Sequence, residues 1–192
     1  MSHRFRPDPG LQPLATGIAQ HLQARAALVD GPWLRGEQSR LARECLRHAF
    51  HRCAADEGTV WLLHDGALVP ALNSGAQAAR LEDTFRQPLD RGIIGMVAVT
   101  EQAYCENDVA DDTRRDGTLD ALLQVQTSAM MAVPFVFGGS VRGVVSCVQF
   151  VRSTPRTGFT PSHLDQLERE VHLAGRLLDL ALLDGLFGLH DA

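Results

Sequence analysis

The sequence predicts an α+β domain, an α/β sandwich in which helices pack on a central β-sheet. Two strand-turn-strand patterns, at 59–73 and 128–151, each contain glycine at the turn. Two helical patterns, at 37–53 and 160–186, repeat apolar residues every three or four positions. The chain of 192 residues is long enough for one such domain and too short for two of ordinary size.

Composition and charge describe an ordinary globular protein and disfavour nucleic-acid binding. Apolar residues make up 45% of the chain and charged residues 21%, and the formal net charge is −5. All 18 cationic residues are arginine, and they form no basic cluster that could follow a phosphate backbone. No run of about eighteen apolar residues predicts a membrane span, and the start lacks the apolar core of a signal peptide. We therefore expect a cytoplasmic protein with neither a nucleic-acid nor a membrane partner.

The first 33 residues are expected to form an extension that carries an amphipathic helix. Four apolar residues share one helical stripe: Leu11, Leu14, Ile18 and Leu22. The stripe fits a helix packed on the domain or a helix that mediates dimerisation, and the sequence leaves both open. Asp30-Gly31-Pro32 ends this helix. We place the domain itself at 34–187 and a short tail at 188–192.

A second helix is predicted from Glu37 to Cys53. Its apolar face comprises Leu41, Cys45, Leu46, Ala49, Phe50 and Cys53. Cys45 and Cys53 are therefore interpreted as small core residues, separated by roughly 12 Å of helix rise, which is too far for a disulfide. Because the four cysteines form no CxxC pair and no zinc-type spacing, we expect reduced thiols and no metal site.

The first strand pair is predicted at Thr59–His64 and Ala67–Asn73. The first of these strands is rich in β-branched and aromatic residues, and Asp65-Gly66 is typical of a two-residue hairpin turn. The polar stretch that follows, up to Gln87, has weak periodicity and predicts a short helix or a loop.

Short elements are expected between the two strand pairs. A helix over 93–100 would turn Ile94, Val97 and Ala98 inward, and Asp90 could cap it. A brief extended segment at 103–107 leads into an acidic loop at 108–116, which we interpret as a mobile, solvated loop with local charge pairs. A further short helix begins at Thr118.

The most apolar stretch of the chain predicts a hairpin of Ser128–Phe137 and Val141–Val151. The adjacent glycines 138 and 139 supply the positive φ angles that a tight turn requires. Its long apolar runs indicate strands that are covered on both faces. Ser146 and Gln149 are unusual polar residues in such a strand, and they point to opposite faces. One of them is expected to line a polar cavity, and the sequence does not decide which.

A long closing helix is predicted from Thr160-Pro161 to about Leu186, because a capping side chain precedes a proline at the first helical position. Its heptad-like seam consists of Leu164, Leu167, Val171, Ala174, Leu178 and Ala181. Past Leu177 the helix is apolar nearly all round, which one side of a sheet cannot bury. This end of the helix therefore predicts self-association.

Together these segments resemble a GAF domain, a small-ligand sensing module, from about Glu37 to Leu183. The resemblance rests on TVWLLHDGALVPALNSG (59–75), LDRGIIGMVAVTEQAYCENDVADD (89–112), SAMMAVPFVFGGSVRGVVSCVQF (128–150) and FTPSHLDQLEREVHLAG (159–175). It implies a GAF/PAS-like antiparallel sheet of about six strands with helices on both faces. It also implies terminal helices on one face, often forming a dimer interface, and a ligand pocket on the other face under the segment 89–126.

The residues match none of the better-defined ligand types of that family. Its cyclic-nucleotide signature contains a lysine, which this chain lacks, and no Cys-His pair provides the usual covalent bilin anchor. An enzymatic branch reduces free methionine sulfoxide with a pocket cysteine, and Cys105 would be that cysteine. Glu101, Glu106 and Asp108 flank it and would raise its thiol pKa, which disfavours catalysis. No catalytic motif and no cofactor is identified.

Eight residues are assigned to the pocket by position alone. They are Trp61, Ile94, Tyr104, Cys105, Asn107, Asp108, Met130 and Gln149. Asp108 also resembles a recurrent family aspartate that more often caps the following turn.

We expect a stand-alone, non-enzymatic bacterial sensor that binds an unidentified small molecule and signals to another protein. It would act as a homodimer through the Leu164–Phe187 helix, with the Leu11–Leu22 helix as a second candidate contact. The alternatives are an interaction module without a ligand and a reductase of free methionine sulfoxide that uses Cys105.

Overall fold

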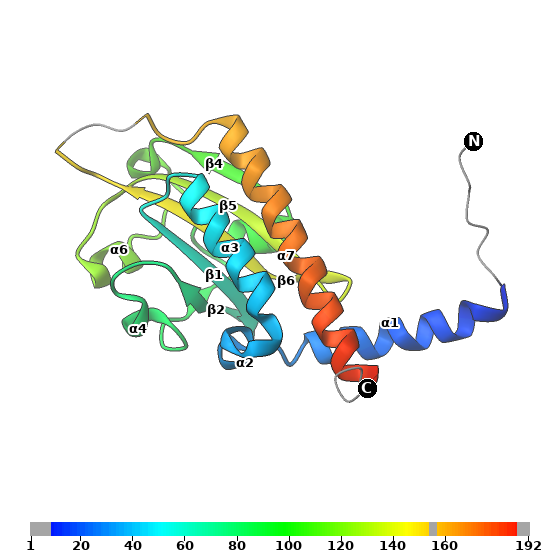
Figure 1. Cartoon of the computed structure of the whole chain (residues 1–192). Coiled ribbons are helices and arrows are strands. Elements are labelled where there is room, and N and C mark those ends of the chain that lie inside the picture. Colours follow the sequence, from blue (N-terminus) through cyan, green and yellow to red (C-terminus); the bar gives the residue numbers. More distant parts are fainter. Residues whose placement is uncertain (1–8, 154–156, 188–192) are drawn as a thin grey trace, which may run out of the picture.

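A six-stranded antiparallel sheet forms the centre of the fold in the computed structural model, which describes residues 9–153 and 157–187 (Figure 1). From edge to edge the strands are β3 (Gln87–Pro88), β2 (Ala67–Asn73), β1 (Glu57–His64), β6 (Ser140–Phe150), β5 (Thr127–Phe137) and β4 (Tyr104–Glu106). Every neighbouring pair is antiparallel. The predicted α+β class with about six antiparallel strands is therefore confirmed.

Both predicted hairpins form, and their turns use the expected backbone angles. Asp65 and Gly66 have φ values of 48° and 74°, the pair of positive angles that a two-residue turn between twisted strands requires. Gly138 and Gly139 have φ values of 60° and 81°. A Cβ at Gly138 would also lie 2.2 Å from the Cβ of Ala26, so the hairpin tip approaches the N-terminal helix closely.

Two long helices, α3 (Arg40–Arg52) and α7 (Pro161–Phe187), lie side by side on one face of the sheet (Figure 1). Four residues of the predicted seam of α7 are buried in the core on this face: Leu167, Val171, Ala174 and Leu178. Gly175 allows the close contact, because a Cβ there would lie 2.1 Å from the carbonyl oxygen of Val136. The seam therefore packs within the chain, and only the outward face of α7 is left for another molecule.

The predicted apolar face of α3 needs one correction. Leu41 is 65% exposed, whereas its neighbour Ala42 is buried. The α-helix begins at Arg40 after a 3-10 turn, η2 (Glu37–Ser39), and its buried face consists of positions 42, 46, 49, 50 and 53, which follow helical spacing. Of the two cysteines assigned to that face, Cys53 is buried and Cys45 is half-buried.

The opposite face of the sheet is covered by short elements: α4 (Ala78–Leu81), α5 (Ile93–Thr100), η3 (Val109–Asp111) and α6 (Thr118–Leu123). They enclose a second apolar cluster around Trp61, Ile94 and Val97. The prediction that Asp90 caps α5 is wrong. Gly92 precedes the helix with φ of 78° and no side-chain cap, because the chain turns into the helix two residues after the aspartate.

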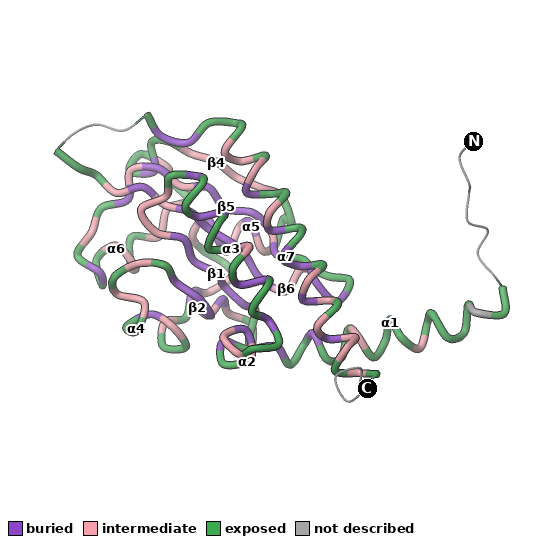
Figure 2. Tube along the Cα trace, viewed as in Figure 1, coloured by how far each residue is buried: buried purple, intermediate pink, exposed green. Residues whose placement is uncertain are grey.

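The N-terminal helix α1 (Gln12–Ala26) projects from the domain and contacts it near its C-terminal end (Figure 1). Leu14 is 62% exposed and Ile18 is 36% exposed, whereas Ala26 is buried. Figure 2 shows that α1 is exposed along most of its length, while burial concentrates in the strands and the inward faces of α3 and α7. The apolar stripe of α1 is therefore largely open in the isolated chain.

A short helix, α2 (Gly31–Arg35), spans the predicted boundary between extension and domain, and the carboxylate of Asp30 accepts a hydrogen bond from the backbone N–H of Trp33 at 2.8 Å. Three stretches lie outside the described residues: 1–8 of the predicted extension, 154–156 after the second hairpin, and the predicted tail 188–192. Among the described residues, no helix is long and apolar enough to cross a membrane.

Candidate ligand cavity

A cavity of about 80 Å³ lies between the sheet and the layer of short helices opposite α3 and α7. Strands β1, β2, β5 and β6 form its floor, and α5, α6 and the loop before α6 form its roof. Its apolar walls include Ile93, Ile94, Val109, Leu119, Leu123, Met130, Val148 and Phe150. An apolar cavity of about 150 Å³ holds one benzene molecule, so this cavity fits a ligand with fewer heavy atoms than benzene.

The central strand β6 presents Ser146 and Val148 to the cavity. Its alternate residues Cys147 and Gln149 therefore point to the other face of the sheet, where Cys147 packs in the core under α3 and α7. The hydroxyl of Ser146 accepts a hydrogen bond from the indole N–H of Trp61 at 2.9 Å. Of the two polar residues singled out in this strand, Ser146 is thus the one that lines the cavity.

Polar residues of β1 and β2 gather at one end of the cavity. The side-chain N–H of Asn73 donates to the hydroxyl of Thr59 at 2.8 Å and, at 3.5 Å, to Oε2 of Glu57. Burial raises the pKa of the Glu57 carboxyl, with a further contribution from the negative charge of Asp56. No described residue forms an ion pair with Glu57, so its carboxylate faces the cavity without a counter-charge.

The roof of the cavity contains two aspartates that each accept several hydrogen bonds and lie beside an arginine. The Asp120 carboxylate accepts from Arg115 at 2.7 Å and from both the backbone N–H and the hydroxyl of Thr127, at 2.9 and 2.8 Å. The Asp116 carboxylate accepts from Gln87 at 3.0 Å and lies 3.5 Å from Arg91. These bonds tie the segment 115–120 to the sheet through Gln87 of β3 and Thr127 of β5.

Three of the eight predicted site residues line the cavity: Trp61, Ile94 and Met130. Whether they contact a ligand stays a prediction. Gln149 lies behind the sheet, where its amide N–H reaches the carbonyl of Ala54 at 3.3 Å and its side-chain oxygen has no described partner. Its assignment to the pocket is wrong, because the pleat of β6 directs it toward the helices.

The other four predicted residues lie on β4 or just after it, away from the cavity: Tyr104, Cys105, Asn107 and Asp108. The reason is topological, since β4 pairs only with β5 at the edge of the sheet. The Asn107 side chain bonds the backbone of Phe159 in both directions, at 2.7 and 2.9 Å. Asp108 is exposed and forms no side-chain cap for the following turn, so its expected capping role is wrong as well.

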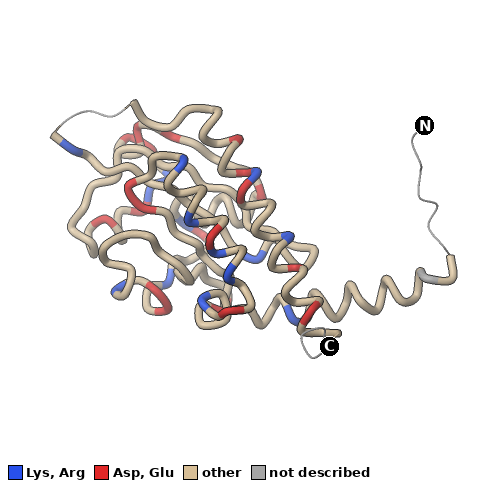
Figure 3. The backbone as a smooth tube through the Cα atoms, in the orientation of Figure 1, with Lys and Arg blue, Asp and Glu red and all other residues tan. Residues whose placement is uncertain are grey.

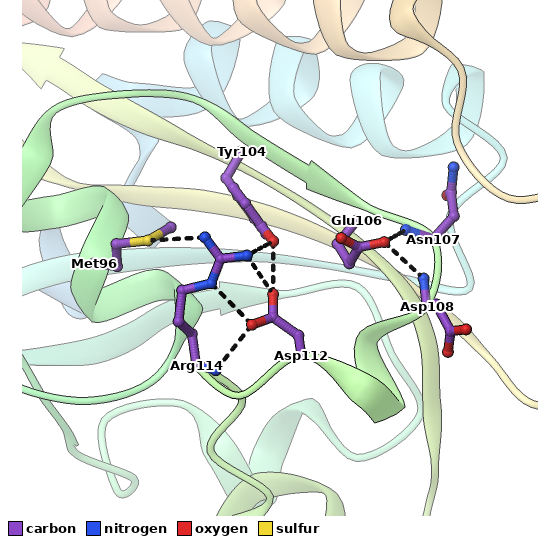
Figure 4. Close-up of polar contacts among 7 residues, drawn as sticks. All are labelled: Met96, Tyr104, Glu106, Asn107, Asp108, Asp112 and Arg114. Atoms are coloured by element: carbon purple, nitrogen blue, oxygen red, sulfur yellow. Dashed lines mark hydrogen bonds and ion pairs between the residues drawn. The ribbon is translucent and has the colours of Figure 1, made fainter.

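Tyr104 is instead part of a polar cluster that holds the acidic loop against β4 (Figure 4). Its hydroxyl donates to Asp112 at 2.6 Å, and the guanidinium of Arg114 donates to the same carboxylate at 2.8 Å and stacks 4.6 Å above the tyrosine ring. The Arg114 hydrogen bonds lower the pKa of Asp112, and burial together with Asp112 raises the pKa of Tyr104 to about 12. The loop therefore has the predicted local charge pairs but is anchored rather than simply solvated.

The described residues contain no group of three or more His, Cys, Asp or Glu side chains that could hold a metal ion. All four cysteines are free thiols. Cys105 packs against the core on the helix side of the sheet, and burial followed by the charge of Glu106 raises its thiol pKa. Cys45 has its pKa raised to about 12, first by burial and then by Glu170. Neither environment favours a thiolate nucleophile.

Glu57, Thr59 and Asn73 are lining residues that sequence reasoning missed. One signal could have found two of them: positions 57, 59 and 61 alternate along one strand, so a cavity at Trp61 places Glu57 and Thr59 on the same face. Asn73 joins them only through pairing, because it lies opposite Thr59 in the β1–β2 ladder.

A family model described as GAF domain matches residues 37–179. A search of the curated proteins gives no significant match.

Several solved structures share the fold. The GAF domain/HD domain protein from Geobacter sulfurreducens has a TM-score of 0.62 at 17% identity, covering 77% of this chain and 95% of that one. The GAF domain of a phosphoenolpyruvate-protein phosphotransferase from Coxiella burnetii has a TM-score of 0.62 at 15% identity, covering 89% and 96%. A type II free methionine-R-sulfoxide reductase from Thermoplasma acidophilum has a TM-score of 0.57 at 16% identity, covering 73% and 94%. At these identities the likeness concerns the fold alone.

Proposed function

This chain belongs to the GAF domain family, and we propose that it is a sensor that binds a small molecule in the cavity under α5 and α6 and acts as a homodimer. GAF domains are typically signalling or sensor modules, and the cavity is the observation that carries the proposal for this chain. It lies on the face of the sheet opposite the terminal helices, so one face is available for a ligand and the other for a partner.

The polar groups of the cavity support binding over a purely structural role. Ser146 and Trp61 are both buried, and their hydrogen bond satisfies two polar groups that an all-apolar core would not contain. Glu57 keeps a carboxylate beside apolar walls, which costs solvation free energy unless something in the cavity compensates. A module that served only for dimerisation would be more stable without these groups.

The β5–β6 hairpin provides a physical link between cavity and terminal helices. Ser146 lies midway along β6, and at the hairpin tip the backbone N–H of Gly138 donates to Asp179 of α7 at 2.6 Å. Near the same tip, the guanidinium of Arg142 donates to the carbonyl of Gln23 of α1 at 3.0 Å. A ligand that shifts β6 would therefore act directly on the contacts of both α1 and α7.

The proposed dimer surface is formed by α1 and the outward face of α7, which contact each other in the chain. Its exposed apolar residues are Leu14, Ile18, Leu173, Leu180 and Phe187. Figure 3 shows that α1 carries almost no charge, and Arg25 is its one charged residue. Apolar surface with few charges, such as that of α1, is typical of a homodimer interface, and a second copy supplies a matching surface by symmetry.

Two features speak against catalysis by Cys105 and favour binding without turnover. The thiol packs on the helix side of the sheet, away from the cavity, and its pKa is raised rather than lowered. The free methionine sulfoxide reductase among the similar structures supports a shared fold and no more.

The proposal is tested by ligand binding to the full chain and to two matched variants of α5. Ile94→Phe adds volume inside the cavity, whereas Val99→Phe places the same ring on an exposed position of the same helix. Native mass spectrometry of freshly purified protein and thermal shifts across a metabolite panel should reveal a small ligand. Binding should disappear in Ile94→Phe and persist in Val99→Phe. A chain that carries no bound mass and responds to no compound would refute the proposal for the ligands tested.

A further inference from the structure

Among the acids that line the cavity, Glu57 is the one without a cationic partner in the described part of the chain. Its only hydrogen bond there is the 3.5 Å contact from Asn73 to Oε2, and no described residue donates to Oε1. Gly75 leaves room for this carboxyl, since a Cβ there would lie 2.0 Å from Oε1. Glu57 is thus a cavity-lining acid whose Oε1 accepts no hydrogen bond from a described residue.

The other two lining acids are balanced. Asp120 pairs with Arg115 at 2.7 Å, and Asp116 lies 3.5 Å from Arg91 and also accepts from Gln87. The positive charges of Arg115 and Arg91 offset the negative charges of these two aspartates. No described cation offsets the charge of Glu57. A negative charge in a partly desolvated site is stabilised by a nearby positive charge that also donates hydrogen bonds.

The remaining surface of the cavity offers little that would attract an anion. The indole N–H of Trp61 is already used by Ser146, and the amide N–H groups of Asn73 and Gln87 donate to protein oxygens. Arg115, the one arginine in the lining, is paired with Asp120 at 2.7 Å, and most other lining residues are apolar, including Ile94, Leu119 and Val148. The cavity thus combines one acceptor end that carries a negative charge with apolar walls.

We propose that the cavity selects a small organic cation, a primary ammonium or amidinium group on a short apolar chain, whose N–H groups donate to the Glu57 carboxylate. This inference rests on the proposed sensor function and narrows the ligand to one chemical class. The volume of about 80 Å³ sets the size at a few heavy atoms.

The test uses three probes of nearly equal size and different charge, n-propylammonium, n-propanol and propionate, in isothermal titrations at constant ionic strength. For a ligand of four heavy atoms the best attainable dissociation constant is on the order of tens of micromolar, so millimolar probe concentrations suffice. The full chain is compared with two variants. Glu57→Gln keeps the shape of the side chain and removes its charge. Glu57→Asp keeps the negative charge but moves the carboxylate back by one methylene group. Glu168→Gln, at an exposed position of α7, is the matched control.

We expect the unaltered chain to bind propylammonium at least about tenfold more tightly than propanol. Glu57→Gln should remove that preference and leave propanol binding unchanged, Glu57→Asp should weaken amine binding by less, and Glu168→Gln should have no effect.

Two results overturn the inference while leaving the sensor proposal intact. In one, propanol or propionate binds as tightly as the amine. In the other, amine binding persists in Glu57→Gln. If none of the three probes binds, the inference also fails, and the metabolite panel with Ile94→Phe decides separately on the sensor function.

Discussion

Replacing Asp120 by alanine should release the roof of the cavity from the sheet. Asp120 on α6 accepts three hydrogen bonds, from the Arg115 guanidinium and from the backbone N–H and hydroxyl of Thr127 at the start of β5. Thr127 is buried, so its backbone N–H would lose its acceptor in a place with little access to water. An orphaned buried donor costs about 1–3 kcal/mol, and the lost hydroxyl bond adds about 1 kcal/mol.

The ion pair with Arg115 adds little to this sum. The arginine side chain is 28% exposed, and partly exposed pairs contribute about 0–1 kcal/mol. We therefore expect Asp120→Ala to lower the free energy of unfolding by about 3 kcal/mol. For a chain of this length, that corresponds to a fall in Tm of about 6–12 °C. Asp120→Asn retains one acceptor oxygen and should cost roughly half as much.

Urea denaturation followed by circular dichroism measures both variants. Asp111→Ala is the control, because Asp111 is an exposed acid of the neighbouring turn and its substitution should change stability by less than about 0.5 kcal/mol. A loss below about 1 kcal/mol in Asp120→Ala would show that these three hydrogen bonds do not anchor the roof, and the argument from their geometry would fail.

Two further predictions concern the dimer and the cavity acid. Leu180→Glu, on the outward face of α7, should convert the proposed dimer to a monomer in light scattering. Leu122→Glu, exposed on α6 over the opposite face of the sheet, should leave the dimer intact. An unchanged mass in both variants would contradict the proposed interface. Burial raises the pKa of Glu57 in the folded chain, so this carboxyl favours folding below its unfolded pKa of about 4.3 and loses that contribution as the pH rises through the folded value. Glu57→Gln should therefore be more stable than the parent at pH 7 in urea titrations and lose this advantage near pH 4. If the two proteins differed in unfolding free energy by the same amount at both pH values, the result would count against the desolvation of Glu57.

The elements that the sequence predicted best are those specified by local chemistry. The Asp65-Gly66 turn and the glycine pair at 138–139 require positive φ, which few residues adopt, so their positions follow from residue identity. The start of α7 follows in the same way from Thr160-Pro161, and the helix begins at Pro161. Leu41 was misplaced because helical spacing back from Leu46 leads to Ala42, and Leu41 points about 100° away from it toward solvent.

The candidate site was harder to predict because it is made by strand pairing across long stretches of chain. Thr59 lies opposite Asn73 in one ladder and opposite Ser146 in another, and these two pairings create the polar end of the cavity. No local sequence pattern around Asn73 or Ser146 predicts that either residue lies opposite Thr59. The same limitation misplaced Tyr104 and Cys105, whose extended conformation was predicted correctly while their position on an edge strand was not.

The position of β6 gives this cavity its significance for a sensor. Occupation of a small site changes little by itself, and a ligand can shift an equilibrium only by its difference in affinity between two states. Here Ser146 contacts the cavity, and the turn that joins β6 to β5 contacts α7 through Gly138 and Asp179. A ligand that pulls Glu57 and its β1 neighbours toward the roof would also move β6, which pairs with β1 from Glu57 to Leu62. The free energy of ligand binding would then be coupled to the position of α1 and α7 through the β5–β6 hairpin alone.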